Sequence, residues 1–312
     1  MEQMAILIAG PTASGKSALA LDVAQEVNGL IINTDSMQVY RDLPILTARP
    51  GAASLARAPH RLYGVLGAQE KCSAGRWLEL AGAALEEARE TGKTPIFVGG
   101  TGLYFRALEE GLAPVPPVPE DCQTRAAALY DEIGGPAFRA ALAARDPESA
   151  ARLPGADRQR LIRAWGVVEA TGTPLSAWQK IKVKPLFTGP RLGFVLAPER
   201  VWLYQRCDAR FDAMMAAGAL DEVRALRARG LAPALPALRA LGVRPLLRAL
   251  DGELPLTQAV TEAKTLTRRY AKRQMTWFRT QMIAWRHIKM EELERIRDEI
   301  FTNIRTYFLT GR

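Results

Sequence analysis

The sequence is poor in the residues that form disulfide frameworks and metal sites. Its 312 residues include three cysteines, Cys72, Cys122 and Cys207, and two histidines, His60 and His287. The cysteines are odd in number and never have C-x-x-C spacing, so we expect neither a disulfide framework nor a zinc site. Because free thiols are typical of a reducing compartment, we expect a cytoplasmic protein.

Long apolar runs are missing as well. The apolar run at residues 4–9 is too short for the core of a signal peptide or for a membrane-spanning helix, and it leads directly into a glycine-bounded loop. We therefore expect no membrane partner. The hydrophobic fraction of 48% is ordinary for a chain that folds around an apolar core, so we expect a globular protein.

Acidic residues are outnumbered, and the excess of basic residues is concentrated near one end. The formal net charge is +9, and residues 264–289 contain eight Lys or Arg and no Asp or Glu. On a helical projection Lys264, Arg268, Lys272 and Arg279 fall on one side. A solvated helix face usually mixes both signs of charge, so this basic row favours the binding of phosphates over simple solvation.

The most informative segment lies at residues 10–17, which match G-x-x-x-x-G-K-[ST] completely. An apolar segment typical of a buried strand precedes it, and a helical pattern follows. Loop amides and a helix N-terminus bind phosphate groups, and the final hydroxyl can ligate Mg²⁺. A strand–turn–helix with incidental glycines is the alternative. The loop consists of Gly10, Pro11, Thr12, Ala13, Ser14, Gly15, Lys16 and Ser17.

Two further predicted strands end in polar residues. The segment 29–34 leads into Asp35 and Ser36, and the segment 95–98 leads through two glycines into Thr101. Because chemistry gathers at the carboxyl ends of strands in open parallel sheets, we expect these residues beside the phosphate loop. Asp35 alone is ambiguous, since Asp after a strand is also a common helix cap.

The pattern of segments predicts an α/β fold, a P-loop-type parallel sheet flanked by helices with an inserted all-helical domain. Four prolines at residues 114–119 can continue neither helix nor central strand, so we interpret them as the entry to the insertion. The expected division is a catalytic core of residues 1–113 and 190–312, with a helical insertion domain of residues 114–189. Residues 44–75 are expected to be rich in loops, and a strand at 192–196 returns to the sheet.

Gln274 lies in the same expected helix as the basic row, but it projects toward the apolar side of that helix. A polar amide in that position needs a partner, so it either hydrogen-bonds buried backbone or faces a substrate cavity. The residues alone leave both possibilities open.

Six segments, spread in order over nearly the whole chain, resemble one family closely, the bacterial tRNA dimethylallyltransferases or tRNA isopentenyltransferases. Six co-linear matches are far more specific than the phosphate loop alone. The matching segments are GPTASGKSALA at 10–20, IINTDSMQVYRDL at 31–43, GGTGLYFRALEEGL at 99–112, RQRLIRAWGVVEATGTPLS at 158–176, RFDAMMAAGALDEVRAL at 210–226 and RRYAKRQMTWFR at 268–279.

The resemblance implies a reaction and its participants. A dimethylallyl group passes from dimethylallyl diphosphate to the exocyclic amine of the adenosine on the 3′ side of a tRNA anticodon, with Mg²⁺ assisting and diphosphate leaving. The loop would then hold the donor diphosphate and not ATP. Asp35 matches the family's general base, Thr101 a threonine near the reacting amine, and Arg210 an arginine that contacts the diphosphate together with Lys16.

The resemblance also implies a surface that binds the tRNA anticodon stem-loop. Three positions depart from the family's pattern: Gly166 stands for a common glutamate, Pro245 for a polar residue, and Gln123 for an arginine that Arg125 could replace. The implied tRNA-binding residues are Asp35, Ser36, Met37, Gln38, Thr101, Gln123, Gln159, Arg160, Leu161, Ile162, Arg163, Arg239, Arg244, Lys272, Arg273, Gln274, Trp277 and Arg279.

Three other functions use part of this pattern. A P-loop small-molecule kinase would explain the loop but not the basic row, and an isopentenyltransferase of free adenine nucleotides would need neither the row nor the insertion. An RNA-binding protein with a nucleotide switch would leave Asp35 without a role. One active site is complete in one chain, so we expect a monomer.

Overall fold

The computed structural model describes residues 3–289, 298, 300–302 and 304–306. The chain forms two compact units, one of residues 1–108 and 187–312 and the other of residues 109–186. The helical unit thus begins five residues before the expected insertion and ends three residues before its expected end. Each unit has its own apolar core.

The first unit is built on a six-stranded sheet in the order β3-β2-β4-β1-β5-β6, with every pair parallel. The prediction of a parallel α/β fold is confirmed. The strands are β1 (Ala5–Ala9), β2 (Gly29–Asn33), β3 (His60–Arg61), β4 (Thr94–Gly99), β5 (Arg191–Leu196) and β6 (Arg286–Ile288).

The central strands are apolar because both of their faces are covered. All five residues of β1 are fully buried, and Ile6, Ile8, Ile31, Ile96 and Val98 share one core cluster with the buried face of α1. In the register of the sheet, Ala9 of β1 lies opposite both Gly99 and Val195. The carboxyl ends of the neighbouring strands are therefore level, which sets the position of the site.

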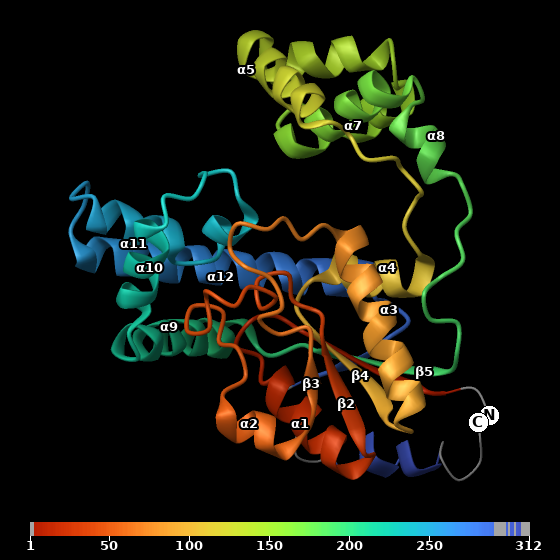
Figure 1. Ribbon diagram of the computed structural model, residues 1–312, viewed down its shortest axis with the longest axis vertical. Helices are drawn as coiled ribbons and strands as arrows, with labels where there is room; N and C mark the ends of the chain where they lie inside the picture. Colours follow the sequence, from red (N-terminus) through yellow and green to blue (C-terminus); the bar gives the residue numbers. More distant parts are fainter. Residues whose placement is uncertain (1–2, 290–297, 299, 303, 307–312) are drawn as a thin grey trace. The chain divides into compact units, whose positions relative to one another are not determined.

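Helices flank this sheet. Four of them, α9, α10, α11 and α12, pack against one another as a group beside it (Figure 1). None of the described helices combines the length and the apolar character that crossing a membrane requires. The helices are α1 (Lys16–Glu26), α2 (Ala52–Arg57), α3 (Ala74–Glu90), α4 (Gly102–Glu110), α9 (Arg200–Ala216), α10 (Ala219–Ala228), the 3₁₀ helix η1 (Pro236–Arg239), α11 (Val243–Leu250) and α12 (Leu256–Gln281).

The segment 44–75 is rich in loops, as expected, and also contains the short helix α2 and the short strand β3, which the pattern did not indicate. One local prediction was wrong. The helical pattern assigned to the basic row ends at Gln281 because the chain then enters the sheet as β6, beside β5. Gly193 of β5 permits this approach, since a Cβ there would lie 2.6 Å from the ring of Trp285.

The second unit is helical, with α5 (Glu120–Ala143), α6 (Pro147–Arg152), α7 (Arg158–Thr171) and α8 (Leu175–Gln179). Its core includes Phe138, Leu142 and Leu161, all fully buried. α5 is kinked at Gly134, whose φ of 77° is left-handed. Gly135 then allows a close approach, because a Cβ there would lie 2.1 Å from the carbonyl oxygen of Gly155.

Candidate active site

The phosphate loop links β1 to α1 through a tight curl of backbone. Gly15 has a φ of 88° and caps α1, which begins at Lys16, and Ala13 also has a positive φ of 64°. Gly10 has no room for a side chain, since a Cβ there would lie 2.9 Å from Ser14 Oγ. This curl places the helix N-terminus, with its partial positive charge, at the edge of a cleft.

The cleft beside the loop has a volume of about 470 Å³ and is positively charged. Burial lowers the pKa of Lys16 to about 8, an effect that the charge of Arg210 strengthens and that of Asp35 opposes. Burial also lowers the pKa of Arg210. The lining consists of Ala13, Ser14, Gly15, Lys16, Ser17, Ala48, Arg206, Ala209 and Arg210. Two desolvated cations at one cleft are suited to an anion such as diphosphate.

Ser14 adds a further polar group to this cleft. Its side chain is fully buried, and its hydroxyl has no hydrogen-bond partner among the described residues. A buried hydroxyl without a partner is costly, so a ligand oxygen at this point would satisfy it.

Both polar groups of Thr12 that could contact a ligand already have partners within the protein. The backbone N–H of Thr12 donates to Gln274 Oε1 at 2.8 Å, and the hydroxyl of Thr12 accepts from Arg210 Nη2 at 2.7 Å. The prediction that Thr12 binds diphosphate is therefore not supported for its N–H. Thr12 instead holds Arg210 at the cleft.

Asp35 follows β2 and is held by its own neighbours. Its backbone N–H donates to Asn33 Oδ1 at 2.9 Å, and Asn33 Nδ2 donates back to the Asp35 carbonyl at 2.9 Å. One carboxylate oxygen accepts from the Met37 N–H at 2.9 Å, and the other has no hydrogen bond or ion pair among the described residues. The two roles considered for Asp35 are thus compatible, because one oxygen caps the turn and the other is left for chemistry.

Thr101 lies at the end of β4, adjacent to the segment that carries Asp35. Its hydroxyl accepts from the Ser36 N–H at 3.0 Å, and its N–H donates to the Thr34 carbonyl at 3.1 Å. Gly99 makes this contact possible, since a Cβ there would lie 2.1 Å from the Thr34 oxygen. Gly99 thus serves the close approach between the two strand ends, whereas Gly100 makes room for the side chain of Gln274.

Tyr270 of α12 is a site residue that sequence reasoning missed. Its hydroxyl is hydrogen-bonded to Thr101, and burial raises its pKa, an effect that the charge of Asp35 strengthens. On a helical projection Tyr270 falls with Ala263 and Leu266 on the apolar side, so the pattern alone indicates packing on the core. The spacing of apolar residues does not reveal what a hydroxyl contacts, so the sequence pattern could not indicate this interaction.

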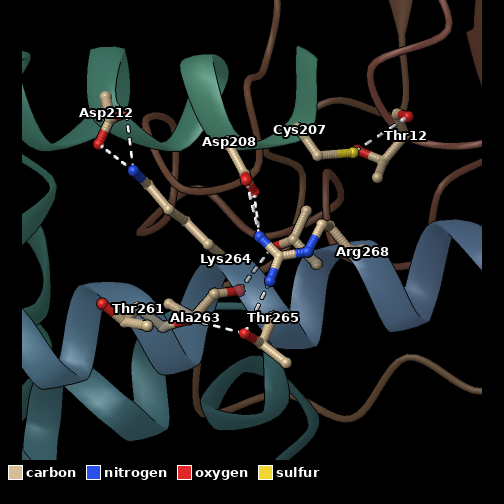
Figure 2. Close-up of polar contacts among 10 residues, drawn as sticks. Thr12, Cys207, Asp208, Asp212, Thr261, Ala263, Lys264, Thr265 and Arg268 are labelled. Carbon is tan, nitrogen blue, oxygen red and sulfur yellow. Dashed lines mark hydrogen bonds and ion pairs between the residues drawn. The ribbon is translucent and has the colours of Figure 1, made fainter. Parts of the chain in front are cut away.

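The basic row of α12 divides into two parts. Lys264 pairs with Asp212 of α9 at 2.6 Å, and Arg268 Nη1 pairs with both carboxylate oxygens of Asp208 at 2.6 and 2.7 Å (Figure 2). Figure 2 shows both basic side chains directed from α12 toward α9. The expectation that this half of the row binds phosphates is therefore corrected, because the acidic partners come from another helix.

The second part of the row is exposed. Lys272, Arg273 and Arg279 are exposed, and no salt bridge involves them among the described residues. Arg273 lies over the ring of Tyr270, 5.6 Å from its centroid. These three side chains are available to an anionic partner.

The other predicted RNA-binding residues of this unit differ in exposure. Arg239 and Arg244 are exposed. Gln38 is half-buried, and its Nε2 donates to the carbonyls of Thr47 and Ala48 at 2.8 and 3.1 Å. Ser36, Met37 and Trp277 are half-buried as well. Trp277 packs where Gly102 lacks a side chain, since a Cβ there would lie 2.1 Å from its ring.

In the helical unit, α7 carries one predicted RNA-binding residue that cannot take that role. Leu161 is fully buried in the core of the unit, so its side chain contacts other apolar residues and not RNA. Ile162 is partly buried against the same core, while Gln159, Arg160, Arg163 and, on α5, Gln123 are exposed. A Cβ at Gly166 would lie 3.3 Å from Val118, which shows how tightly the replaced glutamate position is packed.

No cluster of three His, Cys, Asp or Glu side chains that could hold a metal ion occurs among the described residues. Ser17 is exposed at the start of α1 and lines the cleft. A hydroxyl with ligand phosphate oxygens and water suits Mg²⁺, which keeps several waters and needs few protein ligands. These residues would suit a Mg²⁺ ion bound together with a phosphate-containing ligand.

Comparison with known proteins finds relatives along nearly the whole chain. The family model described as IPP transferase matches residues 38–281, and the model described as isopentenyl transferase matches residues 3–67. The chain is 52% identical to a tRNA dimethylallyltransferase of Parvibaculum lavamentivorans over 98% of this chain and 97% of the relative. It is 55% identical to the enzyme of the same name from Caulobacter sp. over 91% of this chain and 92% of the relative.

Solved structures agree as well. The tRNA isopentenylpyrophosphate transferase of Bacillus halodurans aligns with a TM-score of 0.70 and 31% identity, covering 98% of this chain and 96% of its own. A eukaryotic dimethylallyltransferase acting on tRNA aligns with a TM-score of 0.83 and 27% identity, covering 100% and 80%. This chain belongs to the tRNA dimethylallyltransferase family.

Proposed function

We propose that this protein transfers a dimethylallyl group from dimethylallyl diphosphate to the exocyclic amine of the adenosine on the 3′ side of a tRNA anticodon. One observation carries the proposal. Hydrogen bonds join the turn that carries Asp35 to the phosphate loop: the Ser36 N–H donates to Thr101, and Gln274 bridges Gly100 and Thr12. Thr12 in turn accepts from Arg210, and the charge of Asp35 acts on the pKa of both Lys16 and Arg210, so the candidate base and these two cations belong to one site. A carboxylate beside diphosphate-binding cations suits an amine nucleophile and a diphosphate leaving group.

The leaving-group half of the reaction uses the cleft. Breaking the carbon–oxygen bond of the donor leaves both electrons on the diphosphate. The loop amides, Lys16 and Arg210 are already in place to stabilise this charge, so little reorganisation is needed in the transition state. Mg²⁺, held by Ser17 and diphosphate oxygens, would supply further positive charge when bound.

The nucleophile half uses Asp35 and Thr101. An exocyclic adenine amine is a weak nucleophile, and it must lose a proton as its nitrogen bonds to the allyl carbon. The carboxylate oxygen of Asp35 that does not cap the turn is suited to take that proton. The Thr101 hydroxyl, held by the Ser36 N–H and by Tyr270, is suited to orient the amine.

The tRNA is proposed to bind through its anticodon stem-loop, with the target base flipped out of the stack at a cost of a few kcal/mol. The exposed cations Lys272, Arg273 and Arg279 suit backbone phosphates, and Arg239 and Arg244 extend the positive surface. Asp35, Thr101, Lys16 and Arg210 all belong to one compact unit of one chain. We therefore expect a monomer to be active.

Nucleoside mass analysis tests the proposal. The protein is incubated with Mg²⁺, dimethylallyl diphosphate and tRNA that lacks modification next to the anticodon, and the digested tRNA is searched for a dimethylallyl adenosine. Parallel reactions with AMP and with ATP plus small-molecule acceptors test the alternatives. Product only with AMP, or a phosphorylated small molecule, would overturn the proposal.

A further inference from the structure

Gln274 connects the two loops that follow the neighbouring parallel strands β1 and β4. Its side chain is only 5% exposed on the buried face of α12, between Ala271 and Phe278. Its Oε1 accepts from the Thr12 N–H at 2.8 Å, and its Nε2 donates to the Gly100 carbonyl at 2.7 Å. The first of the two possibilities considered for this amide is therefore the one observed.

Each end of this contact continues into one half of the site. On the diphosphate side, Thr12 also accepts from Arg210 at 2.7 Å. On the amine side, Gly100 is followed by Thr101, whose hydroxyl accepts from the Ser36 N–H next to Asp35. The Gln274 amide thus joins Thr12, which hydrogen-bonds Arg210, to the loop that carries Thr101.

The space around the amide is closed. A Cβ at Gly100 would lie 2.2 Å from Gln274 Nε2, so any side chain at position 100 would displace the amide. Both polar atoms of Gln274 are already bonded to backbone, and the residue is buried. The contact therefore suits a role in holding the two loops and does not suit the RNA contact that the family resemblance implied.

We propose that Gln274 is a positioning residue that fixes the separation between the phosphate loop and the loop after β4, and thereby aligns the allyl donor with the adenosine amine. The inference rests on the proposed function. Misplacement of reacting groups by about 1 Å can cost on the order of 100-fold in rate, so a contact without any atom on the substrates can control turnover.

Two substitutions at Gln274 separate amide chemistry from volume. In Gln274→Glu the carboxylate can accept from Thr12 N–H but cannot donate to the Gly100 carbonyl, and it places a negative charge near the diphosphate. Gln274→Met keeps a similar length and loses both hydrogen bonds. Gly100→Ala should displace the Gln274 amide from the side of the other loop, because the new Cβ would lie 2.2 Å from its Nε2. This variant provides the test if the Gln274 variants do not fold.

The measurement is steady-state transfer, together with tRNA affinity and thermal unfolding of each variant. We expect kcat to fall about 10- to 100-fold in all three variants while the Kd for tRNA is unchanged. The matched control is Thr267→Val on the same buried face, because Thr267 bonds only to Ala263 of its own helix. This control should lose stability and keep its kcat.

The outcomes are distinct. Folded Gln274 variants with wild-type kcat, or with a loss confined to tRNA affinity, would overturn the positioning role. Absence of transfer by the wild-type protein would instead overturn the proposed function and leave the geometry of Gln274 as it stands.

Discussion

Two sets of cations in this protein differ in what surrounds them. Lys16 and Arg210 line the cleft at the phosphate loop, and burial lowers the pKa of both. Lys272 and Arg279 lie exposed on α12. Desolvated, fixed cations stabilise charge that develops during a reaction, whereas exposed cations attract a polyanion and are screened by salt. The first set should control turnover and the second affinity.

A third set shows that position in a charged run does not decide the role. Lys264 and Arg268 belong to the same row of α12 as Lys272, yet each pairs with a carboxylate of α9. Their charge is compensated inside the protein, so they should matter for stability and not for tRNA binding.

Replacement of Arg210 should have the largest effect. Arg210→Ala removes a charged donor from the leaving diphosphate and should lower kcat on the order of 100- to 1,000-fold, as measured by single-turnover transfer. Arg210→Lys keeps the charge but loses the fork that bonds Thr12, so it should restore activity only in part. The control is Arg200→Ala, an exposed cation at the start of the same helix, and an equal loss there would contradict the division.

The lowered pKa of Lys16 predicts a pH dependence. A lysine binds diphosphate in its protonated form, and its pKa in the free protein is about 8. As the pH rises through 8 the charge is lost, so kcat/KM for dimethylallyl diphosphate should fall above this value. Lys16→Arg, which stays charged, should lack this limb in whatever activity it retains. A flat wild-type profile to pH 10 would contradict the assignment.

Removal of an exposed cation should weaken tRNA binding modestly. Lys272→Ala or Arg279→Ala should each raise the Kd for tRNA and reduce the slope of log K against log salt by about 0.7 to 0.9 per lost phosphate contact. Their kcat at saturating tRNA should be unchanged. Lys264→Ala, on the paired half of the row, is the matched control and should leave the slope unaltered. Equal slopes for all variants would show that the row is solvated throughout.

The smallest effect is expected for the paired cations. A double-mutant cycle on Lys264 and Asp212, followed by urea unfolding, should give a coupling free energy of about 0.2 to 1 kcal/mol that falls at high salt. Asp212 is 59% exposed, which limits the strength of the pair. A coupling of zero would place Lys264 with the exposed cations.

Much of the fold was predictable from local patterns. Apolar runs bounded by glycine indicated the strands β1, β2, β4 and β5, because buried parallel strands are uniformly apolar. The helix after the phosphate loop was indicated by the motif itself. The short strands β3 and β6 were missed. Two or three residues at a sheet edge carry no periodic signal, and β6 depends on the space that Gly193 leaves for Trp285.

The site was predictable where residues follow strand ends and not where partners come from distant helices. Asp35 and Thr101 adjoin because β2 and β4 pair, which the topology of a parallel sheet implies. The partners of Lys264 and Arg268 lie 52 and 60 residues away, so a helical projection cannot show them. The same reason hid the contacts of Gln274 and Tyr270. A projection shows which face a side chain is on, and not what it meets there.

Substitution of Asp35 by asparagine separates the role of general base from the role of turn cap. Asp35→Asn keeps an oxygen that can accept from the Met37 N–H and removes the base, so the turn should be preserved while proton transfer is lost. We expect single-turnover transfer of the dimethylallyl group to fall about 100- to 10,000-fold, with the tRNA affinity nearly unchanged. Unchanged transfer by the Asp35→Asn protein would contradict the account, because Asp35 would then only cap the turn.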